Sequence, residues 1–274
     1  MNKKFNLLFG LLAIVGGLCA QAPQADTLNV NYYENFPYAY TENGALKGIE
    51  VDIIKKYVEW LKLEKNINTT VNYKGYKEFS EFYNSVKKGR ANTIGIGSVT
   101  ITEEREKEVA FSPPYLRNIA VLITNGSVSS IKTPTAEEVS KTLGPLDALA
   151  VNESSHLKYM NALKTSYLPS MQIKGTETQT AILNAIAAGK AYGYVDIVAY
   201  WAYIKKNKKT YLKIQKAFNR PYEYLGIVQP FGASHYSSFN EFFENGFGFT
   251  STKIYHEILE RYLGYEVLET LEIK

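Results

Sequence analysis

The sequence contains a single cysteine, Cys19, among its 274 residues. It therefore cannot form an internal disulfide bond, a thiol redox pair or a zinc site built from cysteines. Its basic residues are scattered rather than gathered in blocks and the net charge is only +4, so we expect no nucleic-acid partner. With 45% hydrophobic and 21% charged residues, the chain suits one large or two modest globular domains.

Common enzyme motifs are also missing. The sequence has no phosphate-binding loop, no His-Glu-x-x-His and no Gly-x-Ser-x-Gly, and Gly95-Ile-Gly97 lacks the third glycine of a dinucleotide-binding motif. His156, His235 and His256 have no ligand-like partners at close spacing, so we expect each on the surface or on a helix face. The sequence therefore predicts no catalytic residue, no metal site and no cofactor.

The most apolar stretch lies at the N-terminus. Lys3 and Lys4 precede an uncharged run over 5–20, which is followed by small residues, a layout typical of an export signal. We assign 1–25 to a signal peptide whose exact end is open; a buried N-terminal helix is the alternative. No later segment approaches the length of a membrane span. We expect a periplasmic protein, with a lipid anchor on Cys19 as a variant, although Leu18 stands where a small residue usually precedes a lipidated cysteine.

The rest of the chain alternates short apolar strands with amphipathic helices, which predicts an α/β fold with covered sheets. In one helix Ile53, Tyr57 and Leu61 form a stripe at intervals of four, and a final helix over 252–263 should bury Ile254, Ile258 and Leu259. Strands are expected at 28–32, 93–99, 119–124, 148–151 and 192–195.

A capping box is expected at the start of a helix near residue 176. In Thr176-Glu177-Thr178-Gln179, the Thr176 hydroxyl and the Gln179 side chain would satisfy unpaired amides of the first turn. Ala181, Ile182, Ala185 and Ile186 would form its buried face. Gly189 should end the helix.

The stretch over 95–105 points to an anion-binding site. A strand ending in Ser98 to Thr100, followed by a helix capped by Thr102, would present hydroxyls, backbone amides and the Arg105 guanidinium at one point. Arginine binds carboxylates through two parallel hydrogen bonds. The alternative is that Arg105 pairs with Glu104 or Glu108 on a solvated helix.

Several motifs occur in a fixed order from about 28 to 264. The sequence resembles the bacterial extracellular solute-binding proteins of family 3, the polar amino-acid capture components of ABC importers. The motifs that carry the resemblance are Phe36-Pro37-Tyr38, Asn43-Gly44 with Gly48-Ile49-Glu50-Val51-Asp52, Ile101-Thr102-Glu103-Glu104-Arg105, Phe111-Ser112-Pro113, Thr178-Gln179-Thr180-Ala181 and Tyr262-Leu263-Gly264.

The resemblance implies a two-lobed periplasmic binding protein (type II) fold, in which two hinge strands join the lobes and ligand is enclosed between them. One lobe would comprise 28–117 and 222–274, and the other 118–221. The implied function is to capture a small carboxylate-bearing metabolite, most simply a polar amino acid, and to deliver it to an ABC permease. The resemblance also implies that the protein is a monomer.

The resemblance also implies ligand-binding residues. Arg105 would hold the ligand's carboxylate, aided by Ser98 and Thr100. Ser154 and Ser155 would supply amides from a helix start in the second lobe, and Asp196 would receive the ammonium group, unless it is a simple helix cap. Phe36, Tyr38 and Phe79 would line the cleft as aromatics, with core packing as the other interpretation of Tyr38.

One departure from the family pattern bears on function. Glu153 stands where the family usually has glycine. Pointing inward, it would favour a neutral or cationic amino acid over aspartate or glutamate. It would also suit the proton donor of a cyclohexadienyl dehydratase, an enzyme class on the same fold, although a solvent-facing glutamate is the simpler interpretation. A ligand-sensing receptor domain is a third alternative.

Overall fold

The computed structural model describes residues 22–208 and 210–271. Most of the predicted signal peptide, including Cys19, lies outside the described residues, and the first strand, β1 (Gln24–Tyr33), begins at its expected end. No helix in the described ranges is long and apolar enough to cross a membrane.

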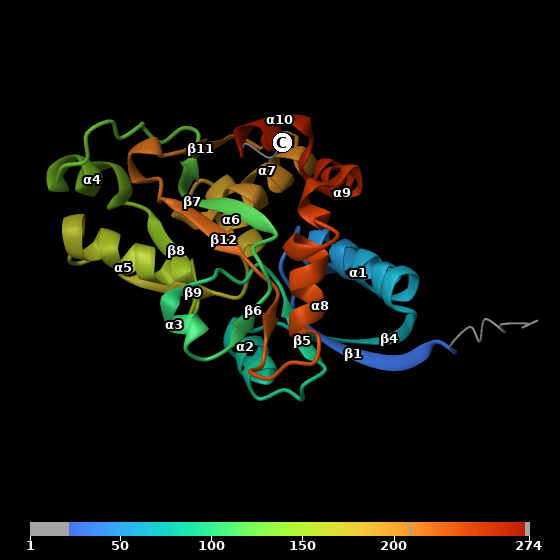
Figure 1. The fold of residues 1–274 in the computed structure, drawn as a ribbon. Coiled ribbons are helices and arrows are strands. Elements are labelled where there is room, and N and C mark those ends of the chain that lie inside the picture. The colour runs from blue at the N-terminus through green and yellow to red at the C-terminus, as the bar shows by residue number, and fades with distance from the viewer. Residues whose placement is uncertain (1–21, 209, 272–274) are drawn as a thin grey trace, which may run out of the picture.

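The first of two large sheets is built mainly from the N-terminal part of the chain (Figure 1). Its strand order is β4-β1-β5-β13-β6. The first strand pairs in parallel with β4 and β5, whereas β13 is antiparallel to β5 and β6. The bounds are β4 (Ile67–Tyr76), β5 (Thr93–Ile96), β6 (Ala110–Phe111) and β13 (Val228–Gln229), and β2 (Tyr40–Glu42) with β3 (Ala45–Lys47) forms the hairpin predicted at Asn43-Gly44.

The second sheet is built from the middle of the chain, in the order β11-β7-β10-β8-β9. Strands β8 and β9 are parallel to their neighbours, and β7 is antiparallel to both β10 and β11. The bounds are β7 (Leu116–Asn125), β8 (Asp147–Val151), β9 (Ile173–Thr176), β10 (Ala191–Asp196) and β11 (Leu212–Ile214).

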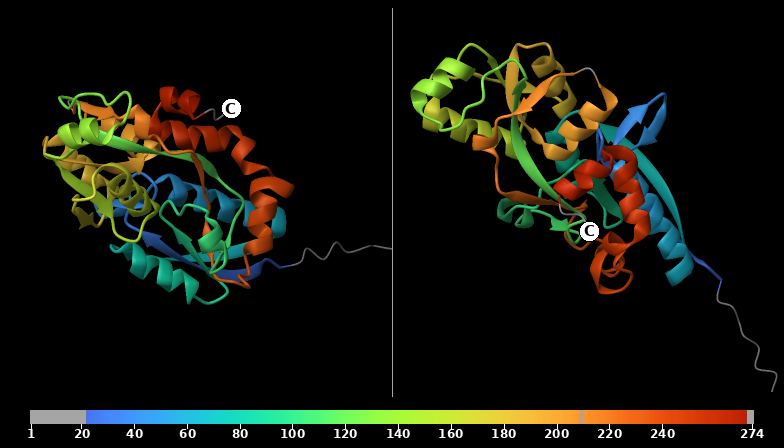
Figure 2. Two further views of the ribbon diagram at one scale, coloured as in Figure 1. Left: turned by 90° about the vertical axis from the view of Figure 1, so that its left-hand side faces the viewer. Right: turned by 90° about the horizontal axis from the view of Figure 1, so that it is seen from above.

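Two antiparallel strands connect the sheets. The first half of β7 pairs with β12 (Tyr222–Leu225), from Leu116 opposite Leu225 to Ile119 opposite Tyr222, and the second half of β7 belongs to the second sheet. The chain thus leaves the first sheet along β7 and returns along β12, as Figure 2 shows. This confirms the predicted connection by two crossing strands.

Helices cover both sheets. Helices α1 and α2 pack on the first sheet, α5, α6 and α7 pack on the second, and α9 contacts both α1 and α7. The helices are α1 (Ile49–Lys65), α2 (Phe79–Lys87), α3 (Glu103–Glu106), α4 (Ala136–Leu143), α5 (Ser155–Tyr167), α6 (Gln179–Ala187), α7 (Ile197–Lys206), α8 (Tyr236–Asn240), α9 (Lys253–Leu263) and α10 (Tyr265–Thr270), with short 3₁₀ or π turns at Lys216–Phe218, Glu241–Asn245 and Phe249–Ser251.

The predicted apolar stripe of α1 is confirmed. Ile53, Tyr57 and Leu61 are buried, and the Tyr57 ring stacks on Phe239 with centroids 4.1 Å apart. The stripe of α9 was displaced by one residue: Ile254 is 41% exposed and Tyr255 is buried instead, together with Ile258 and Leu259. A helix turns by about 100° per residue, so only one of two adjacent apolar residues can face the core at its edge.

The start of α6 also differs from the expectation. Strand β9 continues to Thr176, and the cap is Thr178, whose hydroxyl accepts a hydrogen bond from the Ala181 amide at 3.1 Å. Gln179 is therefore the first helical residue, and its side chain turns toward Asp196 instead of back to the helix start. Ala181 is exposed, while Ile182 and Ile186 are buried as predicted.

Candidate functional site

A small cavity of about 30 Å³ lies between the two sheets. The first wall of the cavity is formed by the first sheet and the segments that follow its strands: Tyr33, Asn35, Phe79, Ser98, Thr100 and Arg105. The second wall is formed by the second sheet and the segments that follow its strands: Val151, Ser154, Ser155, His156, Gln179 and Asp196. The structure thus brings together seven of the nine predicted ligand-binding residues.

The strand end at Ser98 is held from behind by a buried carboxylate. Ser98 adopts a left-handed backbone conformation with φ of 61°. Its amide donates a hydrogen bond to Glu50 Oε2 at 3.1 Å, and its Oγ accepts one from the Asn35 side chain at 2.8 Å. The Tyr115 hydroxyl donates to Glu50 Oε1 at 2.6 Å, and burial raises the pKa of Glu50 to about 7. Sequence reasoning missed this supporting role of Glu50.

Arg105 occupies the first wall without a carboxylate partner. The cap by Thr102 forms as predicted, with the Arg105 amide 3.3 Å from Thr102 Oγ1. The guanidinium donates to the Thr100 carbonyl oxygen at 2.9 Å and lies 5.1 Å from the ring centroid of Phe79. Burial lowers its pKa.

The alternative partners of Arg105 are engaged elsewhere. Glu104 lies 3.6 Å from Lys158, and Glu108 lies 3.0 Å from Lys87. Within 22–208 and 210–271, no Asp or Glu forms an ion pair with Arg105. Since a half-buried guanidinium that lacks an anion favours one strongly, this wall is suited to a carboxylate.

The second wall contains the start of α5, as predicted. Ser154 caps this helix: its Oγ accepts a hydrogen bond from the Leu157 amide at 3.2 Å and its hydroxyl donates to the Val151 carbonyl oxygen at 2.7 Å. Ser155 is the first helical residue and is buried. The helix dipole therefore adds partial positive charge opposite Arg105.

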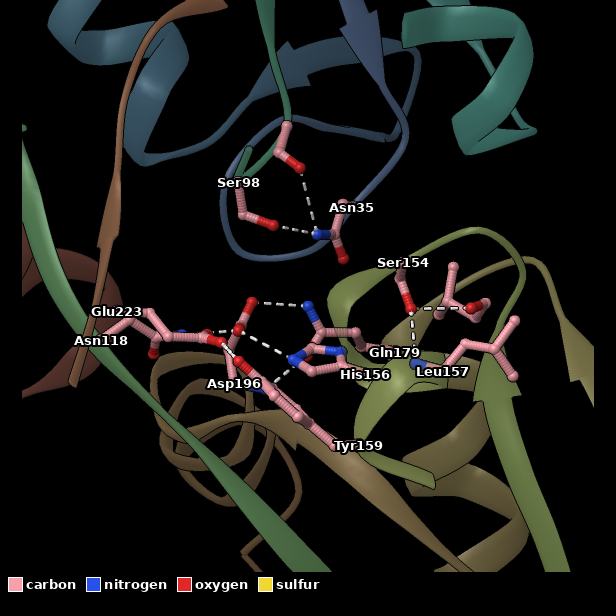
Figure 3. Close-up of polar contacts among 12 residues, drawn as sticks. Asn35, Ser98, Asn118, Ser154, His156, Leu157, Tyr159, Gln179, Asp196 and Glu223 are labelled. Carbon is pink, nitrogen blue, oxygen red and sulfur yellow. Dashed lines mark hydrogen bonds and ion pairs between the residues drawn. The ribbon is translucent and has the colours of Figure 1, made fainter. Parts of the chain in front are cut away.

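Asp196 ends β10 and is almost fully buried, with 3% exposure. Its side chain makes no capping bond to α7, so the helix-cap interpretation is wrong. Instead it accepts hydrogen bonds from the side-chain amides of Asn118 and Gln179, each at 2.6 Å, and pairs with His156 Nε2 at 3.2 Å (Figure 3). Burial opposes its charge, but His156 and the two amides outweigh burial and lower the pKa of Asp196.

His156 and Glu223 are site residues that sequence reasoning missed. His156 is 4% exposed, and although burial opposes its charge, Asp196 raises its pKa. Glu223, on the returning strand β12, is 7% exposed and accepts a hydrogen bond from the Tyr159 hydroxyl. Its second oxygen, Oε2, has no hydrogen-bond partner, and burial raises its pKa.

Each histidine was expected on the surface or on a helix face, and two of the three are buried: His156 lies on a face of α5 that packs inside the protein. Besides His156, His235 is buried between the Tyr57 hydroxyl, 2.8 Å from Nδ1, and Asp26, 3.2 Å from Nε2. The position of His156 directly after Ser154-Ser155, in the first turn of α5, was a usable signal. Glu223 offered none, because its place depends on how β12 returns.

Three other residues do not line the cavity. Tyr38 is fully buried, and burial together with the nearby carboxylate of Asp196 raises the pKa of its hydroxyl. Phe36 packs edge-to-face on Tyr40 with centroids 4.9 Å apart. Phe36 lines a separate surface pocket with Tyr203 and Lys206. Glu153 is exposed, with φ of 55°, at an outer depression next to Arg105 rather than inside the cavity.

One side-chain cluster has the composition of a metal site. His156, Asp196 and Glu223 each offer a donor atom, and these three atoms lie within 4.8 Å of one another.

Two α/β halves joined by two crossing strands, with a charged cavity between them, define the class of type II periplasmic binding proteins. The chain belongs to the bacterial extracellular solute-binding proteins, family 3, whose family model matches residues 28–224.

Known proteins of this kind are similar to the chain over most of its length. A probable amino-acid-binding protein, YxeM from Bacillus subtilis, is 27% identical over 201 residues, or 72% of this chain and 68% of that protein. The arginine-, lysine-, histidine-binding protein ArtJ from Geobacillus stearothermophilus is 21% identical, with a TM-score of 0.68 over 90% of this chain and 99% of that one. A putative ABC-transporter binding component from Wolinella succinogenes, complexed with lysine, is 17% identical, with a TM-score of 0.70 over 89% and 98%.

Proposed function

We propose that this protein captures a free amino acid and delivers it to an ABC importer. The observation that carries the proposal is Arg105, a guanidinium at the cavity that pairs with no carboxylate of the described residues. The names of YxeM, ArtJ and the Wolinella protein support an amino-acid ligand, since each is described as binding amino acids or lysine.

Both charged ends of an amino acid find counterparts at the cavity. The carboxylate would pair with Arg105 and receive amide hydrogen bonds from the start of α5 on the opposite wall. The ammonium group would bind Asp196, whose charge is held in place by Asn118 and Gln179. Ser98 and Thr100 line the same cavity, and the backbone carbonyl of Thr100 accepts a hydrogen bond from Arg105. The guanidinium lies over the Phe79 ring at cation–π distance, which adds to its attraction for this wall.

Ligand entry requires the two halves to separate. The cavity of about 30 Å³ has room for only a few water molecules, which is too small for an amino acid. We therefore propose a clamshell motion in which 28–117 with 222–274 forms one lobe, 118–221 forms the other, and β7 and β12 bend between them. The strand order of the two sheets supports this division, because the first sheet is formed by strands of the first proposed lobe and the second sheet mainly by strands of the second.

Charge favours a neutral or cationic amino acid over aspartate or glutamate. Glu153, which would favour such a ligand if it pointed inward, is exposed. The buried carboxylates of Asp196 and Glu223 give the same preference on firmer ground, because an anionic side chain would meet like charge in a poorly solvated site.

A thermal-shift screen of the twenty amino acids tests the proposal. A ligand at 100 times its dissociation constant adds about 2.7 kcal/mol to stability, so a true ligand should raise the melting temperature clearly. Small-angle scattering with that amino acid should then show compaction. If none of the twenty amino acids raises the melting temperature, an amino-acid ligand is refuted. Stabilisation by glutamate or aspartate alone would reverse the charge preference.

Export to the periplasm, a monomeric state and an ABC permease partner complete the proposal. They draw on the family's extracellular character and on the apolar N-terminal run of the sequence. Fractionation of cells that express the full chain, followed by mass determination of the mature protein, tests export and locates the cleavage site.

A further inference from the structure

We infer that His156, Asp196 and Glu223 form a binding site for a divalent first-row transition-metal ion. The three side chains come from α5, β10 and β12 and converge beside the cavity (Figure 3). This site is distinct in chemistry from the carboxylate-binding wall around Arg105 and goes beyond the capture of an amino acid.

The donor geometry needs little adjustment to hold a metal. Two donors bound to one tetrahedral zinc ion, each about 2.0–2.1 Å from it, are about 3.3 Å apart. His156 Nε2 and Asp196 Oδ1 are already 3.2 Å apart. The Glu223 oxygen lies within 4.8 Å of both donor atoms, so a side-chain rotation would complete a three-residue face.

Two of the three ligands are positioned by further hydrogen bonds. The side-chain amides of Asn118 and Gln179 fix Asp196, and the Tyr159 hydroxyl fixes one oxygen of Glu223. Such outer contacts orient ligands at natural metal centres. They leave Glu223 Oε2 without a hydrogen-bond partner although the residue is 93% buried, as its exposure of 7% implies. A buried carboxylate oxygen without a partner is costly, and a cation removes that cost.

The charges of the cluster suit a divalent ion. Two buried carboxylates lie within a few ångströms of each other, and neither forms an ion pair with Arg105, which turns toward Thr100 and Phe79. Metal binding would release to solvent the proton that His156 Nε2 carries toward Asp196, and the resulting neutral imidazole with two carboxylates offsets a +2 ion. The imidazole selects against Mg²⁺ and Ca²⁺, which prefer oxygen ligands only, and favours Zn²⁺, Co²⁺ or Ni²⁺.

Metal titration of the purified chain, without a histidine tag and after removal of metals with a chelator, tests the inference. We expect calorimetry with ZnCl₂ to show one ion bound per chain at micromolar concentration or tighter, and bound Co²⁺ to give visible absorption bands of low coordination number. His156→Gln and Glu223→Gln should each weaken binding by about 100-fold, the upper range seen even for supporting residues at metal sites. His256→Gln, on α9, is the matched control and should bind as the wild type does.

Two outcomes overturn the inference: no saturable binding of Zn²⁺ or Co²⁺, or binding that survives both His156→Gln and Glu223→Gln. Circular dichroism of each variant shows whether it is folded, and Glu223→Asp provides a second, conservative variant that should retain part of the affinity. No amino acid is present in the titration, so the result is separate from the amino-acid screen. If both proposals hold, Zn²⁺ and the ammonium group share Asp196, and each should weaken binding of the other.

Discussion

The two walls of the cavity handle charge in opposite ways. On the first wall, Arg105 has no ion-pair partner among the described residues, and Glu50 behind it is buried with hydrogen bonds but no cation. On the second wall, Asp196 is surrounded by two amides and an imidazole. The first wall is therefore incomplete without a ligand, while much of the second is satisfied by the protein itself. Replacing Arg105 should therefore affect binding more than folding, whereas replacing Asp196 should affect folding as well as binding.

Asp196→Asn should have the largest effect on folding. It removes the counter-ion of a buried histidine, and breaking a buried pair from one side costs about 3–5 kcal/mol. Urea denaturation of the variant and the wild type measures the change. A loss below about 1 kcal/mol would show that the second wall is less tightly coupled than its hydrogen bonds suggest.

Arg105→Ala should reverse that pattern. Loss of a buried charge-assisted pair costs about 2–5 kcal/mol, so affinity for the amino acid found in the screen should fall by at least about 30-fold. The unfolding free energy should fall by less than in Asp196→Asn, because the variant loses a hydrogen bond to Thr100 and the contact with Phe79 but no ion pair with any described residue. Arg105→Lys is the matched control, because it keeps the charge but not the bidentate geometry. Its affinity for the amino acid should lie between those of the wild type and Arg105→Ala. Unchanged calorimetric affinity in folded Arg105→Ala would refute the role of Arg105.

Glu50 should make the first wall sensitive to pH. Burial raises its pKa from 4.5 to about 7, so the folded state favours the protonated carboxyl. Its contribution to the unfolding free energy is therefore full below pH 4.5 and is lost as pH rises toward and through 7, by about 3 kcal/mol in total. Denaturation at pH 4.5 and pH 8 measures this loss. It should be much smaller in Glu50→Gln, and an equal loss in both proteins would assign it to other groups.

Glu153→Gln should have the smallest effect. The glutamate is exposed outside the cavity, so amino-acid affinity should stay within about twofold of the wild type. Incubation with prephenate should leave that compound unconverted. Conversion by the wild type that Glu153→Gln abolishes would establish the dehydratase alternative.

The sequence predicted the first wall better than the second for a physical reason. Ser98, Thr100 and Arg105 lie within eight residues on one strand-to-helix segment, so local rules of capping and side-chain chemistry place them together. Asp196, Ser154 and Ser155 were found only through the family resemblance. Gln179 was assigned to a helix cap, because its actual partner lies 17 residues away on β10.

The fold was predicted more completely than the site. Strand and helix periodicity depends on neighbouring residues, and it placed β1, β5, β7, β8, β10 and the stripe of α1. It did not predict the other strands of the two sheets, among them β4 and β9. Glu223 could not be predicted in this way, because it reaches the site by pairing of β12 with β7 across more than a hundred residues of sequence. Tyr38 shows the same limit: its aromatic character suits a cleft and a core equally, and in the structure it is fully buried while its hydroxyl lies near Asp196.

The crossing strands do more than connect two halves. Asn118 on β7 stands directly opposite Glu223 on β12, and Asn118 also donates a hydrogen bond to Asp196. Glu223 thus lies on the strand pair proposed as the hinge, whereas Asp196 lies on β10 in the second sheet. If the proposed clamshell motion bends β7 and β12, it would change the distance between these two carboxylates, and a cation bound to both would oppose the opening. The proposed motion would then couple the opening angle to the charge at the site.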